Sequence, residues 1–140
     1  MSRLLALDIG AKRTGIAVTD RQRIIATALQ TVDTKELISF LKTYLQKEEV
    51  EVIIVGMPKN LRNQDTDNTP LVRSFIEILT KQFPKHPIKS IDERFTSSIA
   101  LDTMIAGGMK KKDRREKGNV DKISATLILQ SYMESITGVL

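Results

Sequence analysis

Short apolar runs in the first part of the chain predict three consecutive strands. Residues 4–9 are apolar at every position except Asp8, which is typical of a strand buried on both faces of a sheet. Residues 14–19 and 24–29 also have strand-like patterns, and short polar segments separate the three runs. Three short strands in succession predict an antiparallel meander.

The pattern of apolar positions then changes to that of helices alternating with strands. Asp33 and Glu36 have the spacing of a capping box, and the apolar residues that follow predict a helix to about residue 47. Residues 50–55 form a β-branched run, which is typical of a buried strand. A threonine followed by a proline at residues 69–70 then predicts the first turn of a second helix.

The last part of the chain predicts one more strand and two more helices. Residues 88–93 are expected to form the strand, residues 96–106 a short helix, and residues 119–136 the final helix. Strands that are separated by helices pair in parallel through right-handed crossovers. The sequence therefore predicts an α/β fold in which an antiparallel meander is followed by parallel strands. Its 140 residues fit a single domain, residues 1–140.

Three carboxylates occupy positions that this topology would bring together. Asp8 lies inside the first strand, Glu93 ends the fifth, and Asp121 opens the final helix. A carboxylate in a buried strand is costly unless it is paired, protonated or bound to a cation. If the first and fourth strands are neighbours, the three acids converge at one edge of the sheet, where ligands of such folds bind. Oxygen ligands favour Mg²⁺ or Mn²⁺ over zinc, and one or two ions would fit this cluster.

Each acid also has a purely structural explanation. Asp121 in the first turn of a helix complements the helix dipole. Glu93 could pair with Arg94, and Asp8 could cap the turn at Gly10. The functional interpretation depends on the three acids acting jointly.

Positive charge is concentrated in one segment of the chain. The net charge is +5, and residues 110–117 (KKKDRREK) contribute six basic and two acidic side chains, which is +4 and leaves +1 for the rest. Glycines flank this segment and favour a loop. A solvated charge run is the alternative, but the localised excess favours an anion-binding loop. Its candidate contacts with a nucleic-acid backbone are Lys110, Lys111, Lys112, Arg114 and Arg115.

Two other polar loops follow predicted strands. The turn after Asp8 offers backbone amides together with Lys12 and Arg13, which suits a phosphate, although both could be ordinary solvated residues. It is not a P-loop, because the GxxxxGK[ST] pattern is absent. Asn60 lies in the polar loop after the fourth strand and is a further candidate contact with a nucleic-acid backbone.

Composition excludes several kinds of chemistry. The chain has no cysteine, so disulfides, thiolate zinc sites and thiol nucleophiles are ruled out. Its one histidine, His86, lies between two prolines, which is typical of a surface turn. No apolar run reaches the roughly 18 residues of a membrane span, and no apolar region of a signal peptide follows the first residues. We therefore expect a cytoplasmic protein that does not enter a membrane.

The chain resembles the YqgF family in four segments, which read in order LALDIGAKRTGIAVTD, IIVGMPKN, IDERFTSSIA and NVDKISATLILQSYME. This family comprises the RuvX-type Holliday junction resolvases, which are also described as pre-ribosomal-RNA nucleases. The resemblance implies an RNase H-like fold, a five-stranded mixed sheet flanked by helices on both faces. It also implies a catalytic, metal-binding triad of Asp8, Glu93 and Asp121. The residues that match the other motif positions of the family are Lys12, Arg13, Arg94, Thr96 and Ser97.

The chain departs from the family pattern at two places. Residues 60–68 contain no glycine, where the family usually has a glycine-containing acidic stretch. Ser124 and Ala125 stand where two alanines are usual. The first departure bears on substrate contacts from this loop, and the second changes little.

The resemblance implies a hydrolase of ester bonds, a metal-dependent endonuclease that leaves 5′-phosphate and 3′-hydroxyl ends. Its partner would be structured RNA or branched DNA. The favoured role is processing of the 5′ end of pre-16S ribosomal RNA, with a ribosome precursor as partner. The alternative is resolution of four-way DNA junctions, which would need a symmetric dimer. No dimer seam is evident, so a monomer or a weak homodimer is expected.

Two further classes of function remain open on the sequence. One is a non-catalytic ribosome-assembly factor that binds nucleic acid, although the presence of all three acids argues against it. The other is half of a sugar-kinase or actin-like ATPase, because Asp8 and Gly10 also resemble the first phosphate motif of that superfamily. Those ATPases need two such domains, and 140 residues provide one.

Overall fold

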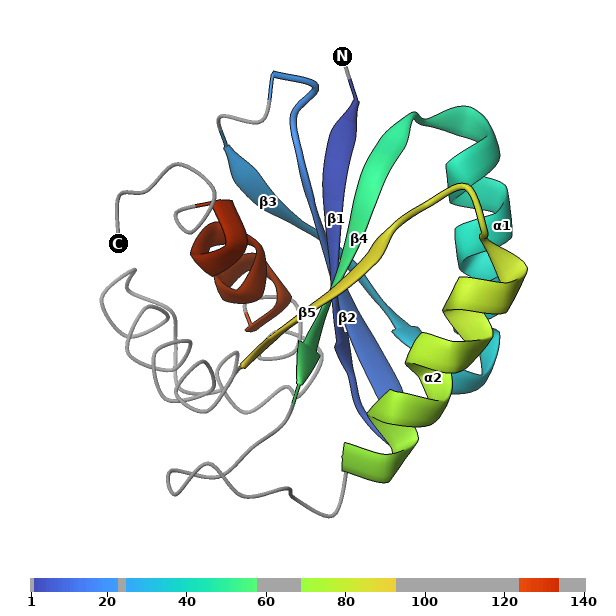
Figure 1. Cartoon of the computed structure of the whole chain (residues 1–140). Coiled ribbons are helices and arrows are strands. Elements are labelled where there is room, and N and C mark those ends of the chain that lie inside the picture. Colours follow the sequence, from blue (N-terminus) through green and yellow to red (C-terminus); the bar gives the residue numbers. More distant parts are fainter. Residues whose placement is uncertain (1, 23–24, 58–68, 93–123, 134–140) are drawn as a thin grey trace.

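Five strands form one mixed sheet in the order β3-β2-β1-β4-β5 (Figure 1). The computed structural model describes residues 2–22, 25–57, 69–92 and 124–133. The strands are β1 (Arg3–Ile9), β2 (Arg13–Thr19), β3 (Ala26–Asp33), β4 (Val50–Met57) and β5 (Ile88–Asp92). β2 is antiparallel to β1 and β3, whereas β4 is parallel to β1 and β5. The predicted meander followed by parallel strands is therefore confirmed, and the first and fourth strands are neighbours.

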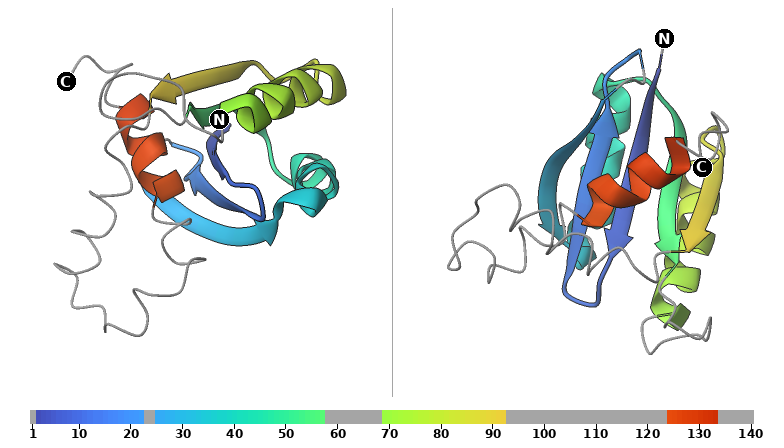
Figure 2. Two further views of the ribbon diagram at one scale, coloured as in Figure 1. Left: turned by 90° about the horizontal axis from the view of Figure 1, so that it is seen from below. Right: turned by 90° about the vertical axis from the view of Figure 1, so that its left-hand side faces the viewer.

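Helices cover both faces of the sheet (Figure 2). The short 3-10 helix η1 (Thr34–Glu36) leads into α1 (Leu37–Lys47), and α2 (Thr69–Gln82) connects β4 to β5. α1 and α2 pack on one face, and the helix formed by residues 124–133 packs on the other. This arrangement places the start of α1 and the start of α2 at the edge where β1 and β4 end.

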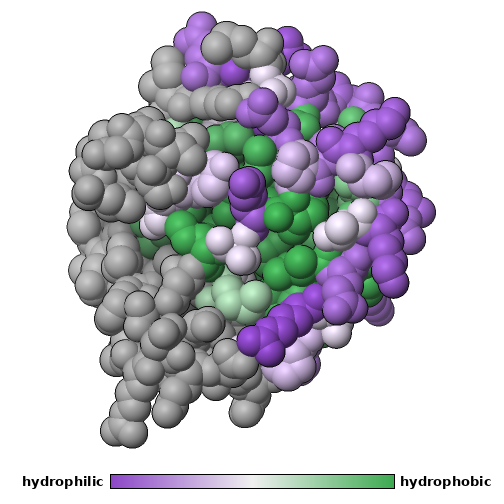
Figure 3. All heavy atoms as spheres, viewed as in Figure 1, coloured by the Kyte–Doolittle hydropathy of each residue, from purple (hydrophilic) through white to green (hydrophobic). Residues whose placement is uncertain are grey.

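Alternation along β1 separates two apolar clusters. Leu5, Leu7 and Ile9 point to the face of α1 and α2, whereas Leu4 and Ala6 point to the face of residues 124–133. Four of these five side chains are larger than alanine, and all five are at most 1% exposed, so β1 is the centre of the core. Figure 3 shows the complementary pattern outside, where hydrophilic side chains gather along α1 and α2.

Two local predictions are wrong. The third strand was expected at residues 24–29, but β3 runs to Asp33 because it continues to pair with the first residues of β2. Its polar residues are tolerated because β3 is an edge strand with mostly exposed side chains. The capping box is the second: Asp33 does occupy the N-cap position before η1, but it also ends β3 and makes no side-chain cap hydrogen bond.

Several expectations fall outside the described residues, among them the helix at 96–106 and the basic segment at 110–117. Residues 124–133 confirm the central part of the predicted final helix. The single-domain expectation stays a prediction. Within the described ranges, no helix combines the length and the apolar character needed to cross a membrane.

Candidate active site

Asp8 is the penultimate residue of β1, and its side chain is half-buried. It alternates with the buried Leu4 and Ala6, so it lies on the face of the sheet that residues 124–133 cover. β4, β5 and β3 also end at this edge of the sheet. The position is therefore a strand C-terminus next to a parallel neighbour, where open α/β sheets bind ligands.

Glycines flank Asp8 on both neighbouring strands. Gly15 of β2 is its register partner. On the other side, Leu7 is in register with Val55, so Gly56 of β4 follows at the level of Asp8. Both glycines alternate with residues of the same face, so neither strand contributes a side chain beside the Asp8 carboxylate. Both glycines are buried, so Asp8 projects from a part of the sheet where its neighbouring strands carry only backbone.

The turn between β1 and β2 begins at Gly10, immediately after the strand that holds Asp8. The Gly10 amide donates a hydrogen bond of 2.9 Å to the Arg13 carbonyl oxygen. A Cβ atom on residue 10 would lie 2.7 Å from the same oxygen, which is closer than real Cβ contacts allow. Only glycine therefore fits at residue 10. The predicted phosphate ligands, Lys12 and Arg13, follow it in the sequence.

Thr34, the first residue of η1, fastens this turn to the end of β3. Its hydroxyl donates to the Gly10 carbonyl oxygen at 2.6 Å and lies 2.9 Å from the Thr14 hydroxyl. Its backbone amide donates to the Lys12 carbonyl oxygen at 2.9 Å. Thr14 is fully buried and Thr34 is 4% exposed, so water does not compete for these bonds. Thr34 thus holds the backbone of the turn at two points and contacts the Thr14 side chain at a third.

A shallow hollow of ≈ 320 Å³ lies beside the turn. Ala11 and Lys12 line it from the turn, and Asp33 and Lys35 line it from the end of β3 and from η1. All four side chains are exposed. The candidate site therefore has a neighbouring surface that carries two cations and one carboxylate.

The other predicted catalytic acids, Glu93 and Asp121, lie outside the described residues. Of their surroundings, Ile91 of β5 packs in the same cluster as Leu4 and Ala6, so it shares the face of Asp8. Of the predicted residues, the structure describes Asp8 near the end of β1, Lys12 in the turn that follows and Arg13 at the start of β2. The remaining predicted contacts also lie outside its description: Asn60, Arg94, Thr96, Ser97, Lys110, Lys111, Lys112, Arg114 and Arg115.

The opposite edge of the sheet is built differently. The Arg3 side chain, at the start of β1, donates to a Glu48 carboxylate oxygen at 3.2 Å and to the Thr19 carbonyl oxygen at 2.9 Å. The hydrogen bond from Arg3 is the main reason that the pKa of Glu48 is lowered. A second cation, Arg21, lies 3.6 Å from the same carboxylate.

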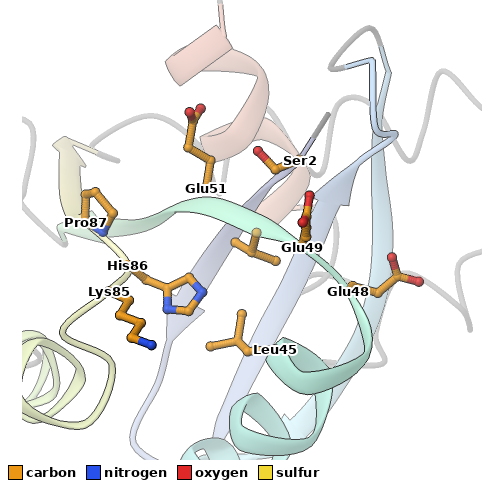
Figure 4. Close-up of a pocket in the computed structure, with 9 residues that line it drawn as sticks. Ser2, Leu45, Glu48, Glu49, Glu51, Lys85, His86 and Pro87 are labelled. Atoms are coloured by element: carbon orange, nitrogen blue, oxygen red, sulfur yellow. The ribbon is translucent and has the colours of Figure 1, made fainter.

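A hollow of ≈ 420 Å³ at this opposite edge is bordered by Glu48, Glu49 and Glu51. Figure 4 shows His86 on its border, with the imidazole ring turned towards Leu45. The ring also meets Phe83 edge-on at a centroid distance of 6.4 Å. His86 is therefore half-buried and not a fully exposed loop residue, and burial followed by the charge of Lys85 lowers its pKa.

The sequence interpretation missed Thr14, Thr34 and Lys35. The two threonines hold the turn, and Lys35 borders the hollow beside it. Thr34 is 24 residues from Gly10 and 20 from Thr14, so no local pattern connects them. Thr14 offered one signal, since it was the first polar residue of a predicted buried strand and such a hydroxyl needs a partner.

The fold defined by this sheet and its helices is RNase H-like. Among solved structures, RuvC of Thermus thermophilus in complex with a Holliday junction substrate is similar with a TM-score of 0.60 and 14% identity, covering 97% of this chain and 96% of RuvC. The Fowlpox virus resolvase in complex with Holliday junction DNA has a TM-score of 0.58 and 14% identity, and the match covers 96% of this chain and 98% of the resolvase. At these identities the likeness shows the fold.

Residues 2–135 match the model of the RuvX family, described as a Holliday junction resolvase, and the chain belongs to this family. A relative from Phocaeicola vulgatus, described as a "Putative pre-16S rRNA nuclease", is 53% identical over 135 residues, 96% of this chain and 97% of the relative. A relative from Flavobacterium johnsoniae with the same description is 45% identical over 135 residues, 96% of this chain and 98% of its own length. The predicted family, the predicted fold and the assignment to the nucleases are thereby confirmed.

Proposed function

We propose that this protein is a metal-dependent endonuclease of structured nucleic acid and that its preferred substrate is the 5′ end of pre-16S ribosomal RNA. The observation that carries the proposal is Asp8, a half-buried carboxylate at the end of the central strand in a chain of the RuvX family. The substrate is chosen from the descriptions of relatives that are 53% and 45% identical over almost the whole chain.

The topology supports Glu93 and Asp121 as partners of Asp8. β5 is described as far as Asp92, and Ile91 shares the face of Asp8, so alternation assigns the next position but one, Glu93, to that face. Asp121 precedes by three residues the helical residues 124–133 that cover the same face.

The residues at Asp8 fit a hard divalent cation such as Mg²⁺ or Mn²⁺. The donor is a carboxylate, the chain has no cysteine, and its one histidine lies at the opposite edge of the sheet. Neither Gly15 nor Gly56 places a side chain beside this carboxylate. Within the described residues no three acids or histidines gather, because the two other proposed ligands lie outside them. When bound, the cation would offset the charge of the attacked phosphodiester and activate water.

The remaining proposed roles belong to the cations around the site. Lys12 and Arg13 extend from a turn whose backbone is held by Thr34, so they can meet the substrate backbone without a large loss of loop entropy. The other proposed substrate contacts are Asn60, Arg94, Thr96, Ser97, Lys110, Lys111, Lys112, Arg114 and Arg115.

A second candidate function is resolution of four-way DNA junctions. The description of the family model favours it. Symmetric cleavage of two strands needs two sites related by a two-fold axis, so this role requires a homodimer. A protein that remains monomeric while bound to a junction would exclude it.

Cleavage of three labelled substrates tests the proposal: a pre-16S ribosomal RNA 5′ end, a single-stranded RNA of the same length and a four-way DNA junction. Each is incubated with Mg²⁺ or Mn²⁺ and with wild type or Asp8→Asn. We expect cleavage of the ribosomal precursor that disappears with a chelator and with Asp8→Asn. Faster cleavage of the junction would select the resolvase role.

Binding without cleavage under both metals would contradict the nuclease proposal. It would favour a non-catalytic assembly factor, particularly if Asp8→Asn left RNA binding unchanged. Tight ATP binding by the protein in the same assays would instead revive the kinase-like alternative. Cleavage of nucleic acid, binding without cleavage and ATP binding are distinguishable because each is measured by a different assay.

A further inference from the structure

We propose that Lys35 and Lys12 together hold a backbone phosphate of the nucleic acid away from the cleaved bond, in the hollow beside the β1–β2 turn. The inference rests on the proposed function, because it extends the path of the substrate from Asp8 towards β3. Lys35 has no role in the functional assignments made above, and this proposal makes it a positioning residue for the substrate.

The first observation is the convergence of two lysines from distant parts of the chain. Lys12 and Lys35 line the same ≈ 320 Å³ hollow, and both are exposed. Among the residues that the structure describes, neither ammonium group forms an ion pair. Two lysines that border one hollow without a carboxylate partner are available to an anion from outside, and a phosphate is the anion that the proposed substrate provides.

The second observation is the rigid connection between the two lysines. Thr34 precedes Lys35, and its amide binds the carbonyl oxygen of Lys12 at 2.9 Å. Its hydroxyl binds Gly10 and Thr14. The backbones that carry Lys12 and Lys35 therefore keep a fixed separation, and they are also fixed relative to the end of the strand that holds Asp8. Preorganisation of this kind lowers the entropic cost of binding.

The position of the hollow indicates which phosphate it would take. Asp33 is the register partner of Arg13 at the end of β3, and β3 is two strands away from β1. Two strand spacings are about 10 Å. The contact would therefore fall on a backbone phosphate near the cleaved bond but not at it.

Asp33 makes the proposal specific, because it contributes the one negative side chain that borders the hollow within the described residues. Its carboxylate opposes a bound phosphate at short range. Removing that charge should therefore strengthen binding, whereas removing the charge of the neighbouring Glu36, which does not line the hollow, should matter less. The two acids form a matched pair, since both are exposed and each substitution changes the net charge by the same amount.

The test measures binding of a labelled four-way DNA junction and a labelled RNA hairpin, in a chelator, over a range of salt concentrations. Lys35→Gln is compared with Lys42→Gln, which removes the same charge from an exposed position on α1. Asp33→Asn is compared with Glu36→Gln. We expect Lys35→Gln to make the negative slope of log affinity against log salt concentration shallower by about 0.9. When the salt concentration rises fourfold, the affinity of the variant should therefore fall by a factor about 3.5-fold smaller than that of wild type.

For the second pair, Asp33→Asn should tighten binding several-fold more than Glu36→Gln. Equal effects within each pair would overturn the proposal, because they would show a response to net charge without a defined site. Urea unfolding of each variant verifies that it is folded, as expected for exposed positions.

The outcome is separable from that of the proposed function. If wild type cleaves with Mn²⁺ but Lys35→Gln and Lys42→Gln bind alike, the phosphate contact is wrong and the nuclease stands. If Lys35→Gln alone changes the salt dependence but no substrate is cleaved, the contact stands and the nuclease is wrong.

Discussion

The two ends of β1 accommodate charged side chains in different ways. At its start, the Arg3 side chain binds a carboxylate and a carbonyl of the same chain, at 3.2 and 2.9 Å. At its end, the hydrogen bonds of Thr34 hold the backbone of the turn that follows Asp8. At the first end, the charge of Arg3 is paired with groups of the same chain. At the second end, hydrogen bonds hold the backbone from which charged side chains extend.

The difference extends to the surfaces beside the two ends. The hollow at the Arg3 end is bordered by three glutamates and one lysine, whereas the hollow at the Asp8 end is bordered by two lysines and one aspartate. A nucleic acid is repelled by the former and attracted by the latter. We therefore expect the Arg3 end of the sheet to contribute to stability and the Asp8 end to bind the ligand, and substitutions at the two ends should separate these roles.

The largest expected effect comes from filling the space beside Asp8. Gly15→Val places an isopropyl group next to the carboxylate and should lower the cleavage rate by about a hundredfold, because displacements of about 1 Å at a reacting group have effects of this size. Ala28→Val on the exposed β3 is the control, since it adds bulk to the sheet away from Asp8. Gly15→Ala provides a smaller obstruction if the valine variant does not fold. Unchanged cleavage by the folded variants would show that the glycines do not shape the site.

A second substitution tests the scaffold at the Asp8 end. Gly10→Ala puts a Cβ atom 2.7 Å from the Arg13 carbonyl oxygen, so the turn must shift. We expect a loss of about 1–3 kcal/mol in the free energy of unfolding, as for other overpacked positions, together with weaker nucleic-acid binding. Gln22→Ala, at an exposed turn position near the opposite end of the sheet, should leave both quantities close to wild type. Urea unfolding and a binding titration check the two parts separately.

The Arg3 end should respond in the opposite way. Arg3→Met keeps an unbranched apolar stem but removes the guanidinium and its hydrogen bonds to Glu48 and the Thr19 carbonyl, which should lower the free energy of unfolding by about 1 kcal/mol. Cleavage per folded molecule should not change, because this end faces away from Asp8. A comparable loss of cleavage and of stability would erase the distinction between the two ends.

The smallest effects concern pH, and they too should originate at the Arg3 end. The hydrogen bond from Arg3 holds the pKa of Glu48 below its ordinary value of 4.5. The folded state therefore gains stability that is present above about pH 4.5 and is lost as the pH falls through the lower folded pKa. Urea unfolding of wild type and Glu48→Gln should show a stability difference at pH 6 that shrinks towards about pH 3.

His86 should contribute in a separate pH range. Its pKa is lowered from 6.5, so the folded state resists protonation more than the unfolded chain does. Stability is then complete above about pH 6.5 and decreases as the pH falls below that value. His86→Gln should remove this decrease, and it is a clean test because the chain has no other histidine. An equal decrease in the free energy of unfolding of the variant would show that other groups cause the pH dependence.

The sequence predicted the parts of this account that depend on local pattern. The apolar run around Asp8 identified a buried strand with a carboxylate that needs explanation, and the helices between later strands predicted parallel pairing, although not that β1 and β4 are neighbours. Features that depend on register could not be predicted in this way. That Gly15 and Gly56 flank Asp8 is visible only once the strand partners are known.

Long-range hydrogen bonds were equally invisible to local reasoning. Asp33 was assigned to a cap because its spacing to Glu36 fits one, whereas pairing with β2 extends the strand through Asp33. The energy of the added strand pairs outweighs a preference for a capped helix start. Thr34, the next residue, then meets Gly10 across 24 positions of sequence.

The most direct test of the central claim is the single-turnover cleavage rate of Asp8→Asn beside that of Arg3→Met, with the preferred substrate and Mn²⁺. Urea unfolding of both variants reports the folded fraction. We predict that Asp8→Asn loses on the order of a hundredfold or more while remaining folded, and that Arg3→Met stays within about twofold of wild type. Near wild-type cleavage by folded Asp8→Asn would contradict the assignment of the chemistry to this end of the sheet.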